Sequence, residues 1–269
     1  MLKKILLITL GAFLVIVTSC KSSKDDTKDT IIKIETDLGN IELRLYNETP
    51  IHKENFIKNV NDGLYNGAIF HRVINEFMIQ GGDPATAEND EQKSFDSEKT
   101  IPGEFNPEYY HKKGSLAAAR MPDAVNPDKE SSAYQFYIVQ GQVFSEKELT
   151  RMAKSMNDNK RKSIADKIIM EQADSLLAQG IEPDFSEIYL NLKDSIDNEI
   201  KKMEKFEFSE EQIETYTTIG GTPHLDGNYT VFGEVQEGLD IVEKIAAVKT
   251  DNADKPLEDI RMKVKILNN

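Results

Sequence analysis

The sequence contains almost no cysteine, because Cys20 is the single one among 269 residues. One cysteine cannot form an internal disulfide, and it excludes a zinc site built from several thiolates. Basic residues are also scarce, since 33 Lys and Arg stand against 47 Asp and Glu and give a net charge of −14. Phosphate recognition depends on Lys and Arg, so we expect no nucleic-acid partner.

The rest of the composition is typical of a folded, soluble chain. Hydrophobic residues make up 39% of the sequence and charged residues 30%, which does not indicate disorder. The length suits one large domain or two small ones, and it allows a sizeable core.

The first 20 residues resemble a targeting segment. Lys3 and Lys4 precede the apolar run ILLITLGAFLVIV, which is short for a membrane-spanning helix of about 20 apolar residues. The run ends in V-T-S-C, which resembles the cleavage box of bacterial lipoproteins, where the cysteine is lipidated and becomes the N-terminus. We predict a signal peptide over residues 1–19 and lipidation at Cys20. The alternative is an ordinary secretory signal followed by an incidental thiol.

Residues 20–30 are predicted to form a flexible tether, because KSSKDDTKDT is polar and low in complexity. Its segment 24–26 resembles the acidic signals that send some lipoproteins to the cell surface. We therefore expect a lipid-anchored protein of the bacterial cell envelope, at the outer membrane, facing the periplasm or the surface.

The stretch 31–141 opens with strand and helix patterns. IIKIET and IELRLY flank the turn 37–40 and predict a β-hairpin. Thr49 and Pro50 predict a helix start, and Gly63 predicts its end. Short apolar runs broken by Gly and Pro follow, as in a compact antiparallel fold.

The stretch 142–215 has a different character, since 28 of its 74 residues are charged and it contains one Gly and one Pro. Apolar residues spaced as on a helix occur on both sides of the turn 180–183. Ser145 with Glu148, and Ser209 with Gln212, have capping-box spacing. We predict two long helices bracketed by two shorter ones, inserted into a β-rich domain, because 216–269 returns to strand patterns with a helix near 238–247.

The segment 70–83, FHRVINEFMIQGGD, combines one cation with apolar and amide side chains. Strand alternation predicts that Arg72, Met78 and Gln80 share a face. Such a set suits a neutral polar ligand with an apolar part. It contains no nucleophile–base pair.

The same segment resembles the signature of cyclophilin-type peptidyl-prolyl isomerases. GSLAAARMP (114–122), SSAYQFYIV (131–139) and TPHLDGNYTVFGEVQEGLDIVEKI (222–245) resemble further blocks of that family, in the family's order. The resemblance implies an eight-stranded antiparallel barrel capped by two helices, formed by residues 31–141 and 216–269. Residues 142–215 would be an inserted helical hairpin.

The resemblance also implies the site. Arg72 matches the catalytic arginine. The substrate-binding positions match, or are replaced in this chain by, Phe77, Met78, Gln80, Ala119, Arg120, Gln135, Tyr137, His224, Leu225 and Tyr229. Arg120 stands where the family usually has Asn, and its long cation could narrow or recharge the groove.

The implied activity is cis–trans isomerisation of X–Pro bonds in exported or envelope proteins, without cofactor or metal. We expect a monomer whose partners are proline-containing unfolded or exported polypeptides. The alternative is a non-catalytic peptide-binding or chaperone module. For the insertion, one hypothesis is a surface that recruits unfolded proteins, and the other is a solvated arm without further function.

Overall fold

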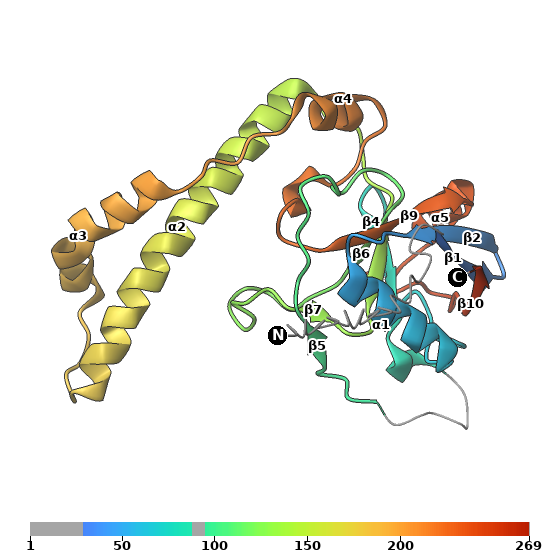
Figure 1. Ribbon diagram of the computed structural model, residues 1–269, viewed down its shortest axis with the longest axis horizontal. Coiled ribbons are helices and arrows are strands. Elements are labelled where there is room, and N and C mark those ends of the chain that lie inside the picture. The colour runs from blue at the N-terminus through green and yellow to red at the C-terminus, as the bar shows by residue number, and fades with distance from the viewer. Residues whose placement is uncertain (1–28, 88–94, 269) are drawn as a thin grey trace, which may run out of the picture.

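The computed structural model describes residues 29–87 and 95–268 (Figure 1). An antiparallel sheet of eight strands has the order β10-β1-β2-β9-β6-β8-β4-β3. A second pair, β5 and β7, lies beside it. The strands are β1 (Thr30–Thr36), β2 (Gly39–Leu45), β3 (Arg72–Ile74), β4 (Met78–Gly81), β5 (Thr100–Ile101), β6 (Ser115–Ala118), β7 (Ser131–Ser132), β8 (Phe136–Val139), β9 (Val231–Glu237) and β10 (Lys263–Asn268).

The two outer strands, β10 and β3, are joined through the residues that precede them. The Phe70 N–H donates to the Ile260 carbonyl at 3.1 Å, and the Met262 N–H donates to the Ala68 carbonyl at 2.8 Å. The sheet therefore curls round on itself, and the predicted antiparallel fold of eight strands is confirmed.

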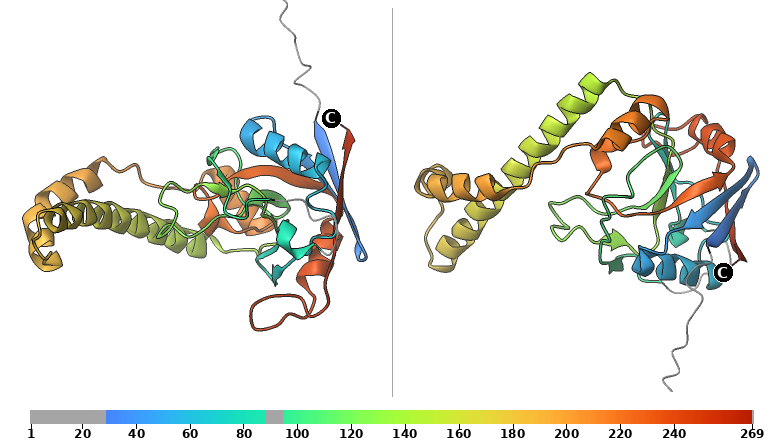
Figure 2. Two further views of the ribbon diagram at one scale, coloured as in Figure 1. Left: turned by 90° about the horizontal axis from the view of Figure 1, so that it is seen from below. Right: turned by 45° about the horizontal axis from the view of Figure 1, so that its top comes forward.

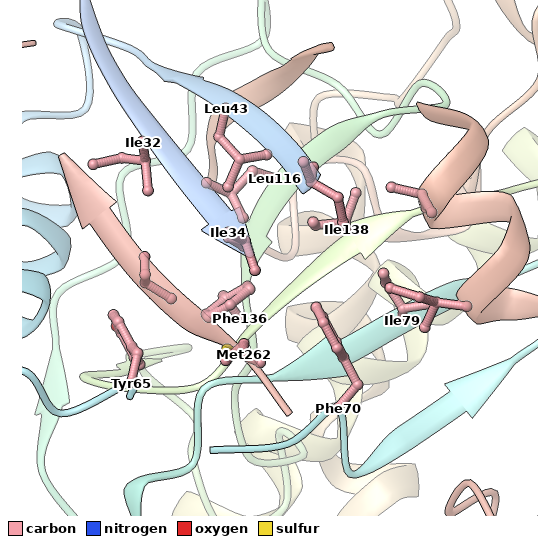
Figure 3. Packing of buried hydrophobic residues seen from close by; sticks show 14 of the residues in the cluster. Ile32, Ile34, Leu43, Tyr65, Phe70, Ile79, Leu116, Phe136, Ile138 and Met262 are labelled. Carbon is pink, nitrogen blue, oxygen red and sulfur yellow. The ribbon is translucent and has the colours of Figure 1, made fainter. Parts of the chain in front are cut away.

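The interior of the sheet holds the main core. Large side chains such as Phe136, Tyr65 and Leu116 are fully buried there (Figure 3). The predicted hairpin supplies one wall, because β1 and β2 pair from Thr30↔Leu45 to Thr36↔Gly39 and turn inward their even-numbered and odd-numbered residues, respectively.

The strands also carry an apolar outer face, because neighbouring residues of a strand point to opposite sides. On β8, Phe136 and Ile138 belong to the interior core, whereas Tyr137 and Val139 pack in a second cluster. Met78 of β4 belongs to that second cluster. This outer face is the floor of the candidate site.

Two helices cover the barrel. The first, α1 (Pro50–Asn61), packs on β10, and the second, α5 (Leu239–Ala246), packs on β2 and β4. As predicted, Pro50 begins α1, and Gly63 follows its C-cap with φ +72°.

Thr49 occupies the N-cap position of α1, but its side chain makes no capping hydrogen bond. The Glu104 carboxylate serves instead, since it accepts from the backbone N–H of Ile51 at 3.1 Å and of His52 at 2.9 Å. A negative charge at this end also complements the helix dipole. His52 is buried, and its Nδ1 and Nε2 lie 2.6 Å from Glu104 and 2.9 Å from Ser131, respectively.

The buried hydrogen bonds of His52 to Glu104 and Ser131 predict that the stability of the fold depends on pH. Burial lowers the pKa of His52 below its ordinary 6.5, against the opposing effect of Glu104. The unfolded chain then binds the proton more readily, so the free energy of unfolding should fall as the pH drops below 6.5. Urea unfolding at about pH 7.5 and 5.5 measures the difference in the free energy of unfolding between the two pH values. His52→Gln should make that difference smaller. An unchanged difference would contradict the assignment.

Three helices lie between β8 and β9: α2 (Glu146–Ala178), α3 (Phe185–Lys202) and α4 (Glu210–Thr218). Both predicted capping boxes are present, at Ser145–Glu148 and Ser209–Gln212. The prediction of a separate short helix before the first long one is wrong. The segment from 146 to 178 contains neither Gly nor Pro, so nothing ends the helix, which continues for 33 residues.

The helices α2 and α3 form an arm that projects from the barrel (Figure 2). Buried Ile188 and Ile196 of α3 face α2 within this hairpin. The chain then returns along α2, where the Asn157 side chain bonds both the N–H and the carbonyl of Phe206, at 2.8 and 2.9 Å. Thus the arm is held by its own contacts.

The arm joins the barrel at a narrow junction. Gln142 and Gly221 exchange backbone hydrogen bonds of 3.2 and 3.0 Å, so the chain leaves and returns at one place. A Cβ on Gly221 would lie 2.2 Å from the His111 carbonyl oxygen, which only glycine avoids. Within the described ranges, no helix is long and apolar enough to cross a membrane. The predicted signal peptide, Cys20 and the tether up to residue 28 lie outside those ranges.

Candidate active site

A cavity of about 630 Å³ opens on the outer face of the barrel. Strands β3, β4 and β8, the segment after β6 and the 225–229 loop contribute to its wall. Nearly all residues predicted for the site line it together: Arg72, Phe77, Met78, Gln80, Ala119, Arg120, Gln135, Tyr137, Leu225 and Tyr229.

Arg72 stands at the edge of this cavity. It begins β3 and pairs with Gln80 across the β3–β4 ladder, so both side chains reach the same side, as the alternation predicts. The side chain of Arg72 is 44% exposed, and its Nε lies 3.5 Å from an Asp254 carboxylate oxygen. Because that contact is solvent-exposed, the guanidinium keeps donors for a ligand.

Amide side chains are aligned beside Arg72. The Gln80 Nε2 donates to the Gln135 Oε1 at 3.0 Å, and the Gln135 Nε2 donates to the Asp83 carboxylate at 3.2 Å. Asp83 also caps the short 3-10 helix 84–86, where its side chain accepts from the Ala85 N–H. Its additional role in orienting Gln135 has no signal in the sequence, because the two residues are 52 positions apart.

The apolar part of the wall comes from Phe77, Met78, Leu225 and the ring of Tyr137. Phe77 and Met78 are neighbours, and strand alternation alone would send one of them into the interior. Both reach the cavity because Phe77 belongs to the turn that precedes β4. Tyr137 is buried, and burial raises its hydroxyl pKa well above 10, so the group stays neutral.

Arg120 does not extend freely into the groove. Its Nε donates to the Asn228 carbonyl at 2.7 Å, and its Nη1 lies 2.6 Å from an Asp123 oxygen. The guanidinium carbon also lies 4.6 Å from the centre of the Tyr229 ring. The charge is therefore neutralised and fixed, and the concern that Arg120 would recharge the groove is answered by these contacts.

His224 lines a neighbouring pocket together with Phe144, which precedes α2, and Met152, near the start of α2. Its ring stacks on Phe77, with ring centres 5.5 Å apart. A substrate-binding role for His224 would thus act through Phe77 from behind the cavity wall.

Sequence reasoning missed the far rim of the cavity. This rim consists of residues in and around β5 and in the loop between β6 and β7: Ser97, Glu98, Lys99, Thr100, Val125, Asn126 and Glu130. Met121 and Ser132, which lie in the recognised blocks 114–122 and 131–139, complete it. Irregular segments have no hydrophobic period, so no pattern marks them. Among the described residues, no group of three or more His, Cys, Asp or Glu side chains is placed to hold a metal ion.

The model of the family described as cyclophilin type peptidyl-prolyl cis-trans isomerase/CLD matches residues 31–162 and 202–266. The chain belongs to this family. The matched residues include every side chain that we assign to the cavity wall of this cyclophilin, and they leave out the distal part of the arm.

Curated relatives agree with this membership. A Staphylococcus saprophyticus protein is 32% identical over 228 residues, which cover 84% of this cyclophilin and 86% of the relative. A Staphylococcus epidermidis protein is 28% identical over 238 residues, with 87% and 91% covered. The names of both provisionally assign them to the peptidyl-prolyl cis-trans isomerases.

Solved structures share the fold. A Cryptosporidium parvum cyclophilin type peptidyl-prolyl cis-trans isomerase has a TM-score of 0.53 at 19% identity and covers 90% of this chain and 99% of its own. A structure of the same protein in the presence of the dipeptide Ala-Pro has a TM-score of 0.51 at 20% identity, covering 89% and 99%.

Proposed function

We propose that this cyclophilin catalyses rotation about X–Pro bonds in exported polypeptides, with Arg72 as the catalytic residue. The observation that carries the proposal is the position of the Arg72 guanidinium beside an apolar cavity and the Gln80 amide. The apolar wall suits a proline ring, and the amides of Gln80 and Gln135 suit the peptide backbone.

The chemistry needs no proton transfer. Amide resonance sets a barrier of about 18–20 kcal/mol to rotation about the peptide bond. Twisting the bond returns the lone pair to the prolyl nitrogen, which then accepts a hydrogen bond that the planar amide cannot. A guanidinium N–H from Arg72 donated to that nitrogen is strongest when the bond is half rotated, so it stabilises the transition state above the ground state.

An isomerisation assay on a proline tetrapeptide tests the activity. Acceleration by the full chain supports the proposal. Peptide binding without acceleration would favour the alternative, a non-catalytic peptide-binding module.

For the location, the proposal is a lipid anchor at Cys20 in the bacterial cell envelope, with the barrel on its tether at the outer membrane. We expect Cys20→Ser to abolish incorporation of labelled fatty acid and to move the protein from the membrane to the soluble fraction, because a thioether-linked lipid needs the cysteine sulfur. Ser22→Ala, two residues away, is the matched control and should change neither. Continued labelling of the serine variant would contradict the anchor.

For the substrates, the proposal is that unfolded polypeptides contact the tip of the arm. Apolar side chains around the α2–α3 turn are exposed, among them Ile181 at 49% and Leu190 at 70%. This turn lies at the end of the arm remote from the sheet (Figure 2).

We expect the double variant Ile181→Ser, Leu190→Ser to lower the acceleration of refolding of an unfolded protein about threefold, since each loses exposed apolar contact area. The kcat/KM on a tetrapeptide should stay unchanged. Leu257→Ser, at a site 65% exposed on the barrel, is the control and should affect neither. Equal losses on both substrates would contradict a recruiting tip.

A further inference from the structure

A chain of four buried polar side chains connects the insertion to the cavity wall. The Tyr216 hydroxyl on α4 donates to Asp226 at 2.6 Å, and Asp226 lies 2.8 Å from the Nδ1 of His111. The Nε2 of His111 lies 2.9 Å from the Tyr137 hydroxyl. The exposed fractions of the four residues are between 0 and 5%.

The direction of the hydrogen bonds follows from the chemistry of the groups. The Asp226 carboxylate accepts from the Tyr216 hydroxyl and from the Nδ1–H of His111, and the His111 Nε2 shares a hydrogen bond with the Tyr137 hydroxyl. Burial, the nearby charge of Asp226 and its hydrogen bond raise the pKa of Tyr216 far above 10, so its hydroxyl keeps the proton that it donates. Every hydrogen-bonding side-chain atom in this series thus has a partner.

Tyr137, at one end of this hydrogen-bonded series of side chains, is part of the site. Its ring lines the cavity, stacks on His111 at 6.0 Å and meets the Tyr229 ring edge-on at 6.0 Å. The hydrogen bond between the Tyr137 hydroxyl and His111 restrains the orientation of the Tyr137 ring. A ring held in this way presents one face to the ligand.

Tyr216, at the other end of the series, lies where the insertion joins the barrel. Tyr216 lies on α4, which runs across residue 215, where we placed the end of the insertion. The carbonyl of Tyr216 accepts from the N–H of Phe144 at 2.9 Å, in the segment that leads from β8 into α2. Tyr216 therefore contacts both ends of the insertion and the buried chain.

We propose that Tyr216 is a positioning residue, which acts through Asp226 and His111 to orient Tyr137 in the substrate cavity. This inference rests on the proposed isomerase function. It makes the last helix of the insertion part of the support of the active site.

The test is a double-mutant cycle in the full chain, with the proline tetrapeptide as substrate. Tyr216→Phe and Tyr137→Phe should each lower kcat/KM about fivefold. The double variant should be no worse than either single variant, because both substitutions interrupt the same series of hydrogen bonds. Tyr110→Phe is the matched control, since its hydroxyl bonds Glu211 and Thr215 of the same helix outside the chain. It should leave kcat/KM unchanged. Losses that multiply, or a Tyr216→Phe variant with unchanged kcat/KM, would overturn the proposal.

A second readout separates this inference from the isomerase function. The NMR signal of the ¹³C-labelled Tyr137 ring should shift in Tyr216→Phe and stay in place in Tyr110→Phe. An inactive wild-type protein would refute the isomerase function, yet the ring signal would still report the coupling. A Tyr137 signal that ignores Tyr216→Phe refutes the coupling itself, even in an active enzyme.

Discussion

Arg72→Ala should lower kcat/KM for a proline tetrapeptide about 100- to 1000-fold, the usual loss when one donor to a developing charge is removed. Arg72→Lys should also lose most of the activity, because an ammonium on a flexible stem does not reproduce the planar donor fork. A protease-coupled assay, or NMR exchange spectroscopy on the same peptide, measures both variants.

The loss should occur in catalysis and leave the fold intact. The side chain of Arg72 is 44% exposed and its ion pair with Asp254 is at the surface, so the melting temperature should hardly change. Arg161→Ala is the matched control, because Arg161 is 47% exposed and has a similar surface ion pair on α2. If Arg72→Ala kept wild-type kcat/KM, the catalytic assignment would be wrong.

Phe136→Ala should lower the free energy of unfolding by about 3–5 kcal/mol, the usual range for a buried Phe truncated to Ala. The ring is 1% exposed within the core shown in Figure 3. It packs edge-on against Phe56 and Tyr65, with ring centres 5.3 and 5.6 Å apart. It lies on β8 between Gln135 and Tyr137, so the cavity wall should loosen together with the core. Urea unfolding measures the first effect and peptide KM the second.

Phe185→Ala is the control for this change. Phe185 begins α3 and is 53% exposed, so its truncation should cost less than about 1 kcal/mol. Similar losses for the two variants would mean that the barrel core does not dominate the measured unfolding.

Local rules predicted the elements of this molecule well. The two capping boxes, the first hairpin and the start of α1 each depend on residues within a few positions of one another, and all are present. The family signature predicted the residues that gather round the cavity. The period of two along β8 explains why Tyr137 can line the site while Phe136 fills the core.

Contacts between residues that are far apart in the sequence could not be predicted from local patterns. Arg120 is held in part by its hydrogen bond to the carbonyl of Asn228, 108 positions away, and the α1 N-terminus is capped by Glu104, 52 positions from His52. Nothing local marks such pairs, because the fold alone brings them together. The same holds for His111 and Asp226, which are 115 positions apart in the chain.

The narrow junction at Gln142 and Gly221 has an evolutionary consequence. A loop whose ends are already held together gains length cheaply, since doubling it costs only about 0.6 kcal/mol of closure entropy. Insertions or deletions of whole helical turns in α2 and α3 would therefore leave the barrel nearly as stable as before, provided that α4 is retained. Natural selection can therefore lengthen, shorten or replace the arm at little risk to the barrel.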